Sequence, residues 1–436
     1  MSDKSHRFSI AFIFMTVLLN MIGLGVIMPV MPQLIMTVTG DGLSRAAQWG
    51  GYLTFVYAAM QFIMMPIIGG LSDRYGRRPV LLISLAAYSF DFLIMAIAPT
   101  IGVILVARLL AGAFAATFST ANAYIADITP PEKRAANFGL MGAAFGLGFI
   151  IGPGIGGLLG DNFGARAPFY FVAMLGGCNL LFGFFVLPET LKPENRRKFE
   201  WRRANAFGNF KQFRKYPIMV PIGLSIFLYQ LAHWTFPSVW SYFAEERFGW
   251  TPSLIGASLM FVGLMAAIVQ GGLTRIVIPK IGERNAALTG TMIAVISYFG
   301  FAVAGNDVAV YALIAFSALA GITQPSLQGI MSRTVPANVQ GELQGAISAV
   351  ASLSMVIGPP LMTQIFAIFS SPATPYKIAG ITLLPSGSGI YFPGAPFVVA
   401  GLITLCAFIP LTHAFSHIVR PREEEEPTPI EPAVVE

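Results

Sequence analysis

The sequence is poor in charge. Of its 436 residues only 11% are Asp, Glu, Lys or Arg, whereas 55% are hydrophobic. A soluble domain carries about a quarter of its residues as charges, so this chain cannot cover itself with a polar surface. Twelve apolar stretches, each long enough to cross a bilayer as a helix, indicate a membrane protein instead.

Reactive motifs are also missing. The two cysteines, Cys178 and Cys406, lie inside apolar stretches, where we expect small packing residues rather than a disulfide. No GxxxxGK[ST] phosphate loop occurs, which excludes a self-contained ATP-driven pump, and there is no HExxH, GxSxG or Cys/His cluster. We therefore expect no enzyme, no cofactor and no metal site.

The apolar stretches predict an all-α membrane protein of twelve transmembrane helices in two pseudo-symmetric six-helix bundles. The expected helices are 8–32, 49–70, 79–98, 101–127, 136–160, 167–188, 218–243, 252–278, 286–305, 308–333, 342–369 and 393–416. The first stretch is followed by eleven more, so we interpret it as a membrane helix rather than a cleavable signal.

Basic residues predict the orientation. With a cytoplasmic N-terminus, twenty-two of the 27 Lys and Arg residues lie inside and four lie outside, and Arg108 lies within the membrane. This bias follows the positive-inside rule, so both termini are expected in the cytoplasm. The net charge of +6 is thus explained by topology, without a nucleic-acid partner.

The two halves repeat. Asp127-Ile-Thr-Pro matches Arg333-Thr-Val-Pro at an offset of 206 positions, and Gly152-Pro and Gly76 recur at the same offset. A duplicated six-helix unit with a central site between the bundles is typical of secondary transporters. The expected organisation is an N-terminal bundle (1–188), a cytoplasmic linker (189–217), a C-terminal bundle (218–416) and a disordered acidic cytoplasmic tail (417–436).

Two connecting segments have distinct compositions. Aromatic and basic residues alternate at helical spacing over 199–216, which indicates either an interfacial helix on the cytoplasmic membrane face or a flexible basic loop. The segment 370–396 carries five prolines and a Ser-Gly-Ser-Gly tract, and we expect a long periplasmic loop there.

The loop between the second and third helices combines glycine and charge. It reads Gly69-Gly-Leu-Ser-Asp73-Arg74-Tyr-Gly76-Arg77-Arg78. Gly76 gives the backbone freedom for a tight turn, and the charges around it can latch the cytoplasmic side of two bundles and release it when they rock. A simple positive-inside anchor is the alternative, but it explains neither Asp73 nor the glycine spacing.

The fifth helix carries a row of glycines. Gly148, Gly152, Pro153, Gly156 and Gly157 place three glycines on one face at i, i+4 and i+8. Such a face allows two helices to approach closely, and Pro153 can kink the helix. Ordinary small-residue packing explains the contact equally well.

Two opposite charges lie deep in neighbouring helices, Asp91 in the third and Arg108 in the fourth. An ionisable group within the bilayer is costly and usually functional. Burial and a neighbouring arginine act in opposite directions on the pKa of a carboxyl group, which is one way to tune it for proton exchange. The pair is therefore a candidate for proton coupling, with a static structural ion pair as the alternative.

These motifs resemble those of the major facilitator superfamily. The charged loop is similar to the signature G-x-L-x-D-R-x-G-R-R, and the glycines of the fifth helix resemble the motif of its drug/proton antiporters. Over residues 8–416, segments such as 25–32, 72–82 and 247–250 look most like the tetracycline/proton antiporters. The resemblance implies a bacterial inner-membrane exporter, with Asp91 and Arg108 at positions essential in that group.

The chain departs from that group at three places. Asn20 stands where those proteins have an acid, Gly263 to Ile268 lack their histidine, and no acid lies between Ala286 and Asn306. These groups are associated with the cationic metal–tetracycline substrate, so their absence counts against tetracycline as the cargo.

Other polar groups lie within the expected helices. His233 can titrate between pH 5 and 8 and is a third candidate for proton coupling, or else a packing residue. The amides seek partners, in a substrate cavity or between helices: Asn20, Gln61, Asn122, Gln230, Gln324 and Gln328. The 36 Phe and 19 Met residues suit an adaptable apolar pocket as well as a lipid-facing surface.

The combined prediction is a proton-coupled antiporter that exports a small hydrophobic or amphipathic compound by alternating access, working as a monomer in the lipid bilayer. An uptake symporter on the same fold is one alternative, which the direction of flux would distinguish. A non-transporting membrane sensor is the other, and deletion of residues 421–436 would disable it more than a transporter.

Overall fold

The computed structural model describes residues 3–130, 133–201, 219–334, 340–371, 376–378, 381–384 and 387–418. Most of them are helical. The first half contains α1 (Asp3–Thr39), α2 (Leu43–Tyr75), α3 (Arg77–Ile97), α4 (Ile101–Ala113), α5 (Thr117–Ile128), α6 (Arg134–Phe163), α7 (Ala167–Val186) and the short η2 (Pro193–Asn195).

The second half follows the same plan with more interruptions. It contains α9 (Met219–His233), α10 (Thr235–Phe248), α11 (Pro252–Ile268), the π-helical η4 (Val269–Leu273), α12 (Thr274–Val303), α13 (Asp307–Ala318), η5 (Leu319–Ile322), α14 (Thr323–Thr334), α15 (Gln340–Ser370) and α16 (Ala395–Ile418). Between α15 and α16, β1 (Tyr376–Ile378) and β2 (Ile381–Leu384) pair antiparallel.

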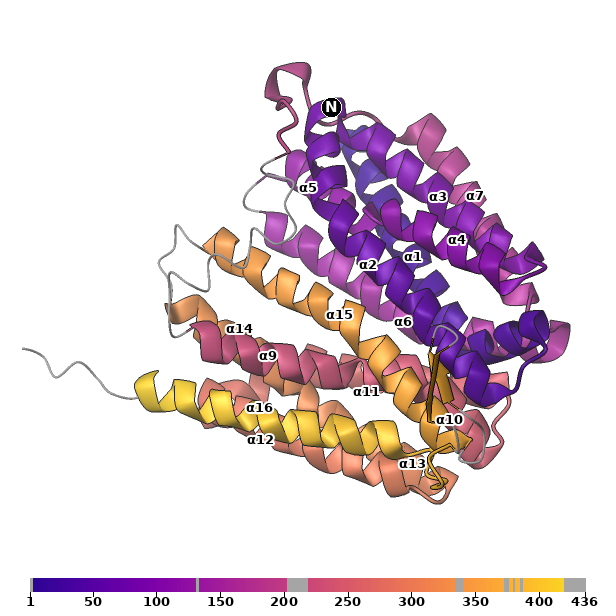
Figure 1. The fold of residues 1–436 in the computed structure, drawn as a ribbon. Helices are drawn as coiled ribbons and strands as arrows, with labels where there is room; N and C mark the ends of the chain where they lie inside the picture. The colour runs from indigo at the N-terminus through magenta and orange to yellow at the C-terminus, as the bar shows by residue number, and fades with distance from the viewer. Residues whose placement is uncertain are drawn as a thin grey trace, which may run out of the picture.

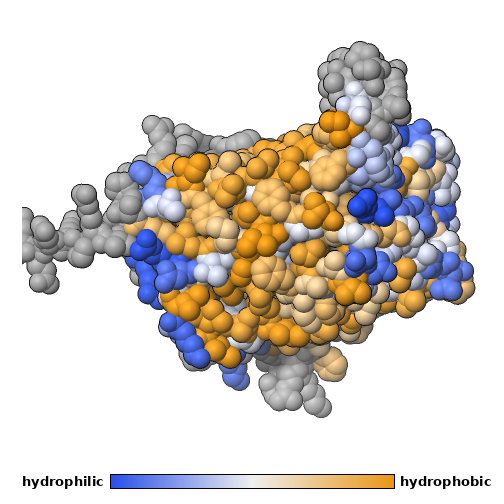
Figure 2. Space-filling view, turned by 90° about the horizontal axis from the view of Figure 1, so that it is seen from below, coloured by the Kyte–Doolittle hydropathy of each residue, from blue (hydrophilic) through white to orange (hydrophobic). Residues whose placement is uncertain are grey.

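These helices account for twelve crossings. Ten helical stretches among the described residues are long and apolar enough to span a membrane. One of them, Pro252–Val303, contains two crossings, because Gly282 turns the chain there with φ of 79°. The broken pair α9 and α10 forms the twelfth. The space-filling view shows a hydrophobic belt with hydrophilic residues at both ends (Figure 2).

The crossings form two bundles, α1–α7 and α9–α16, which lie side by side in Figure 1. We name the two ends by their connections. The linker end holds the α2–α3 turn at Gly76 and the end of α7, and the far end holds the α6–α7 turn and the start of α11. Residues 202–216 of the predicted interfacial helix (199–216) and residues 419–436 of the expected tail (417–436) fall outside the described residues.

Candidate functional site

The two buried charges form an ion pair inside the first bundle. The guanidinium of Arg108, on α4, donates to the carboxylate of Asp91, on α3, and both side chains are less than a tenth exposed. Helices α3 and α4 are antiparallel neighbours, as the sequence predicts, which places the two positions at one level. Each charge is thereby compensated in a region where an unpaired charge would be costly.

Soft and aromatic groups complete the surroundings of the pair. Arg108 lies 2.6 Å from the sulfur of Met95 and over the rings of Tyr57 and Phe92, at 5.7 and 5.8 Å from their centroids. Such cation–π contacts stabilise a guanidinium independently of a carboxylate. Arg108 can therefore remain in place when Asp91 is neutral. Sequence reasoning missed Tyr57, which is half-buried on α2.

The remaining polar candidates are dispersed. Asn20 donates to the carbonyl of Thr16 in its own helix, and Gln61 donates to the carbonyl of Ala115 at the break between α4 and α5. His233 ends α9 with an exposed side chain, and no contact with the Asp91–Arg108 pair is found in the described part of the chain. The other four amides are half-buried: Asn122 on α5, Gln230 on α9, and Gln324 and Gln328 on α14.

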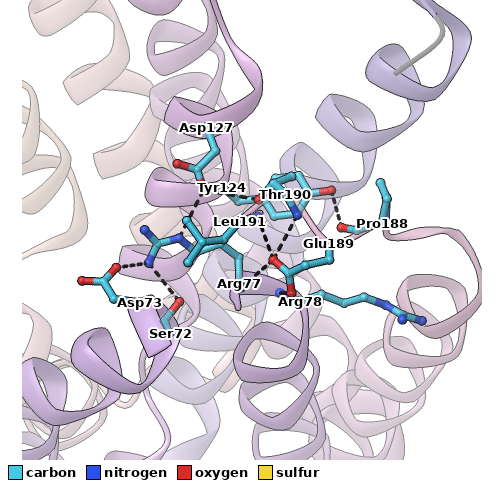
Figure 3. A network of polar contacts seen from close by, with 10 residues as sticks. All are labelled: Ser72, Asp73, Arg77, Arg78, Tyr124, Asp127, Pro188, Glu189, Thr190 and Leu191. Atoms are coloured by element: carbon cyan, nitrogen blue, oxygen red, sulfur yellow. Dashed lines mark hydrogen bonds and ion pairs between the residues drawn. The ribbon is translucent and has the colours of Figure 1, made fainter. Parts of the chain in front are cut away.

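The charged loop forms a network within the first bundle. Arg77 donates to Asp73 at 2.6 Å and to Asp127, on α5, at 3.2 Å (Figure 3). Arg74 faces outward with its guanidinium over Tyr75, and Arg78 donates to the carbonyl of Phe184. All these partners belong to one bundle, so in this conformation the network does not join the two.

Glu189 anchors this network, and the sequence analysis did not single it out. Its carboxylate accepts the backbone N–H groups of Arg77, at 2.9 Å, and Arg78, at 3.2 Å, at the start of α3 (Figure 3). A carboxylate suits a helix N-terminus, where unpaired N–H groups and the helix dipole favour negative charge. Gly76, with φ of 108°, leaves room for it, because an added Cβ would collide with Glu189. An acid just beyond the end of the sixth expected helix was the available signal.

The second bundle repeats the network with its charges reversed. Glu283 accepts from Arg333 at 3.0 Å. An offset of 206 positions relates Glu283 to Arg77 and Arg333 to Asp127. The duplicated helices therefore keep an ion pair at the same place while exchanging which helix carries the positive charge.

The glycine row of α6 contacts a neighbour on each of two faces. A Cβ added at Gly148, Gly152 or Gly156 would lie 2.5–2.8 Å from a backbone carbonyl oxygen of α1. On the other face, Gly157 packs against the backbone of Pro252, and the Pro153 carbonyl contacts Gly256, both on α11. Close packing therefore explains every glycine of the motif, and Gly157 serves the contact between bundles.

The bundles meet at the far end. Hydrogen bonds cross from Ser44 to the Ala367 carbonyl at 2.9 Å and from Ser241 to the Met28 carbonyl at 2.6 Å. Thr251 and Ser253, at the start of α11, donate to Asp161 and to the Gly157 carbonyl of α6, at 2.9 and 3.3 Å. Among the described residues, the side-chain hydrogen bonds found between the bundles all belong to this end.

Toward the linker end the same helices separate. Gly146, Gly142 and Gly139 continue the α11-facing side of α6 at helical spacing, and a Cβ added at any of them would meet nothing within 4 Å. The same is true of Gly69, near the end of α2, and of Gly271, in η4. The structure is therefore closed between the bundles at the far end and open at the linker end.

Comparison with known proteins agrees with this architecture. The family model described as "Major Facilitator Superfamily" matches residues 13–359. The chain is 38% identical over 356 residues to the class C tetracycline resistance protein of Escherichia coli, covering 82% of this chain and 89% of the relative. It is 29% identical over 373 residues to multidrug resistance protein 2 of Bacillus subtilis, covering 83% and 89%.

Solved structures show the same fold. A bacterial homologue of the human lysosomal transporter Spinster, in an inward-facing and unoccupied conformation, aligns with a TM-score of 0.78 at 17% identity, over 95% of this chain and 98% of that one. The human organic anion transporter MFSD10 aligns with a TM-score of 0.65 at 20% identity, over 93% and 99%. On this evidence the chain belongs to the major facilitator superfamily, whose members are membrane transporters and not enzymes.

Proposed function

We propose that this transporter is a proton-coupled antiporter that exports a small hydrophobic or amphipathic compound. The observation that carries the proposal is the buried Asp91–Arg108 pair, within a bundle that opens toward its partner at one end only. The relatives named for tetracycline and multidrug resistance support export as the direction.

The orientation follows from the charges. Twenty-two of the 27 basic residues lie at the linker end, on the sequence-based topology. The positive-inside rule assigns this end, with both termini, to the cytoplasm of a bacterial inner membrane. The conformation is then inward-facing, ready to take up a compound from the cytoplasm or from the inner leaflet.

The ion pair supplies a coupling mechanism. Protonation of Asp91 removes its charge and weakens its hold on Arg108, whose position Tyr57, Phe92 and Met95 maintain. The change in charge favours the inward-open arrangement, in which the proton is released as the compound binds. One outward step for the compound is thus exchanged for the entry of one or more protons.

The loop network and the glycines serve the rocking movement. Asp73 is 41% exposed at the linker end, and Arg77 holds it there. This position lets it latch the second bundle when the cytoplasmic side closes. The opposite closure uses the α6 face around Gly157, so the two motifs act at opposite ends of the same movement.

The groups that differ from the tetracycline antiporters narrow the substrate class. Asp91 is retained, but Asn20 stands in place of an acid, Gly263 to Ile268 lack a histidine, and no acid lies between Ala286 and Asn306. Amides, aromatic rings and methionines suit a neutral or weakly charged amphipathic molecule. A metal–tetracycline chelate is a poorer match, because it needs acidic partners.

The proposal is tested by transport in proteoliposomes. A trapped pH dye reports proton movement while neutral drugs, hydrophobic cations and tetracycline are added in turn. We expect substrate-driven proton movement that is lost in Asp91→Asn, with Asp41→Asn, at an exposed turn, as the matched control. Full proton-coupled activity in Asp91→Asn would refute the coupling role, and uptake down a proton gradient would favour the symporter.

A further inference from the structure

Within the described ranges, four side-chain hydrogen bonds join the bundles at the far end, and one of them ends on a charged group. The hydroxyl of Thr251, at the start of α11, donates to the carboxylate of Asp161, at the end of α6, at 2.9 Å. The other three end on backbone carbonyls. A charged acceptor makes the Asp161 contact the strongest candidate for a specific clasp, because hydrogen bonds to ionised groups are about twice as strong as neutral ones.

The carboxylate also occupies the start of a helix that belongs to the other bundle. Thr251 is the N-cap residue of α11, and its side chain makes no capping bond to that helix. Its hydroxyl instead donates to the carboxylate of Asp161, which comes from the opposite bundle. The unpaired N–H groups and the dipole of α11 favour a negative charge at this place.

Small residues hold the carboxylate in reach. Gly157, one turn before Asp161, packs on the Pro252 backbone, and Ser253 donates to the Gly157 carbonyl at 3.3 Å. A side chain at Gly157 would push the start of α11 away. The end of α6 therefore meets the first turn of α11 through one compact contact, which must separate if the far end is to open.

We propose that Asp161 is a clasp that closes the far end by capping α11 of the opposite bundle. Its carboxylate stabilises the conformation in which the cytoplasmic side is open, and it is released whenever the far end opens. This inference rests on the proposed alternating access, but it concerns the balance between two conformations and not the coupling to protons.

The test measures that balance directly. Spin labels are placed at Thr100 and Val308, exposed far-end positions in different bundles, after Cys178 and Cys406 are changed to serine. Pulsed electron–electron double resonance then measures the distance between the two labels. A short distance reports a closed far end and a long distance an open one, and the two populations give the long-to-short ratio. Asparagine keeps the acceptor oxygen but removes the negative charge that the dipole of α11 favours, so we expect Asp161→Asn to raise the long-to-short ratio about two- to fivefold.

Three further variants make the outcome specific. Asn162→Ala is the matched control, because Asn162 is exposed next to Asp161 and its side chain donates to the Leu158 carbonyl of its own helix. We expect no shift there. Thr251→Val removes the donor and should reproduce the Asp161→Asn shift, and the double variant should add nothing further.

Other results would overturn the clasp. An unchanged ratio in Asp161→Asn, equal shifts in Asp161→Asn and Asn162→Ala, or additive effects in the double variant would each contradict it. The distances are read without substrate or proton gradient, so a failure of the antiport proposal in proteoliposomes would leave this result unaffected.

Discussion

At the scale of single residues, position relative to backbone N–H groups decides which acids matter for stability. The Glu189 carboxylate accepts two N–H groups at the start of α3. Glu194, five residues later, is 71% exposed, and its ion pair with Lys192 is long, at 3.8 Å. We expect Glu189→Ala to destabilise the protein by about 0.5–2 kcal/mol, the usual cost of a lost cap.

Thermal unfolding in detergent measures this difference, with Glu194→Ala as the control. An exposed pair contributes about 0–1 kcal/mol, so the control should unfold close to the wild type. Equal midpoints for both variants would show that the Glu189 carboxylate does not cap α3.

Single residues also show which contacts could be predicted from the sequence and which could not. The Asp91–Arg108 pairing was predicted from two isolated charges on neighbouring helices, and the structure confirms it. Glu189 and Asp161 lie beyond or at helix ends, where acids are common, and their roles depend on which helix start happens to face them. That choice is made by tertiary packing, which a local pattern does not contain.

At the scale of elements, the two faces of α6 respond differently to the same change. Gly152 lies against α1, and an added Cβ would be 2.6 Å from the Ile22 carbonyl oxygen, but Gly146 faces open space. We expect Gly152→Ala to lower stability or yield, because the backbones of two helices would have to separate. Gly146→Ala should be neutral or stabilising by up to about 1 kcal/mol, since alanine favours a helix.

Fluorescence-detected size-exclusion after a heating series compares the two variants in parallel. Similar behaviour of both would mean that α1 and α6 are not packed through this face.

The end of α10 predicts a dependence on pH. Glu245 lies past the expected membrane span 218–243, and burial, reinforced by the charge of Glu246, raises its pKa to about 7. The folded protein therefore holds this proton more tightly than the unfolded chain does. Stability from this group is complete below the unfolded pKa, near pH 4.5, and declines as pH rises toward 7.

We expect the unfolding midpoint of the wild type to fall more steeply between pH 5 and pH 7 than that of Glu245→Gln. The side chain is only partly buried, so the difference is moderated by solvent. Asp41→Asn, at an exposed turn, is the control and should keep the wild-type slope. A Glu245→Gln slope equal to the wild type would exclude Glu245 as the titrating group.

At the scale of the whole molecule, duplication was the most informative sequence signal. The offset of 206 positions predicted two related bundles. The structure has twelve crossings because Gly282 turns the chain within α12, so that Pro252–Val303 crosses twice. The breaks at Phe114 to Ala116 and at Trp234 were not predicted, because the apolar runs continue through them. The conformation was also not predicted, because the proposed alternating access requires one sequence to support both an inward-open and an outward-open state.

The open linker end gives the prediction that tests the conformation as a whole. Gly142 and Gly154 lie on the α11-facing side of α6, but a Cβ at Gly142 meets nothing within 4 Å, and one at Gly154 collides with Met260. In a background without Cys178 and Cys406, we expect Gly142→Cys to react quickly with a water-soluble maleimide. Gly154→Cys should react at least about tenfold more slowly, because α11 covers it.

Addition of the maleimide to the cytoplasmic side of inverted vesicles makes the comparison directional. If alternating access operates, a proton gradient or substrate that favours the outward-open state should slow labelling at Gly142→Cys, because α11 then closes over the same stripe. Fast labelling at both positions would mean that the bundles separate along their whole length. Slow labelling at both would mean that the inward-open arrangement is rarely occupied, and the far-end contacts of Asp161 and Gly157 would then have to be weaker than their geometry indicates.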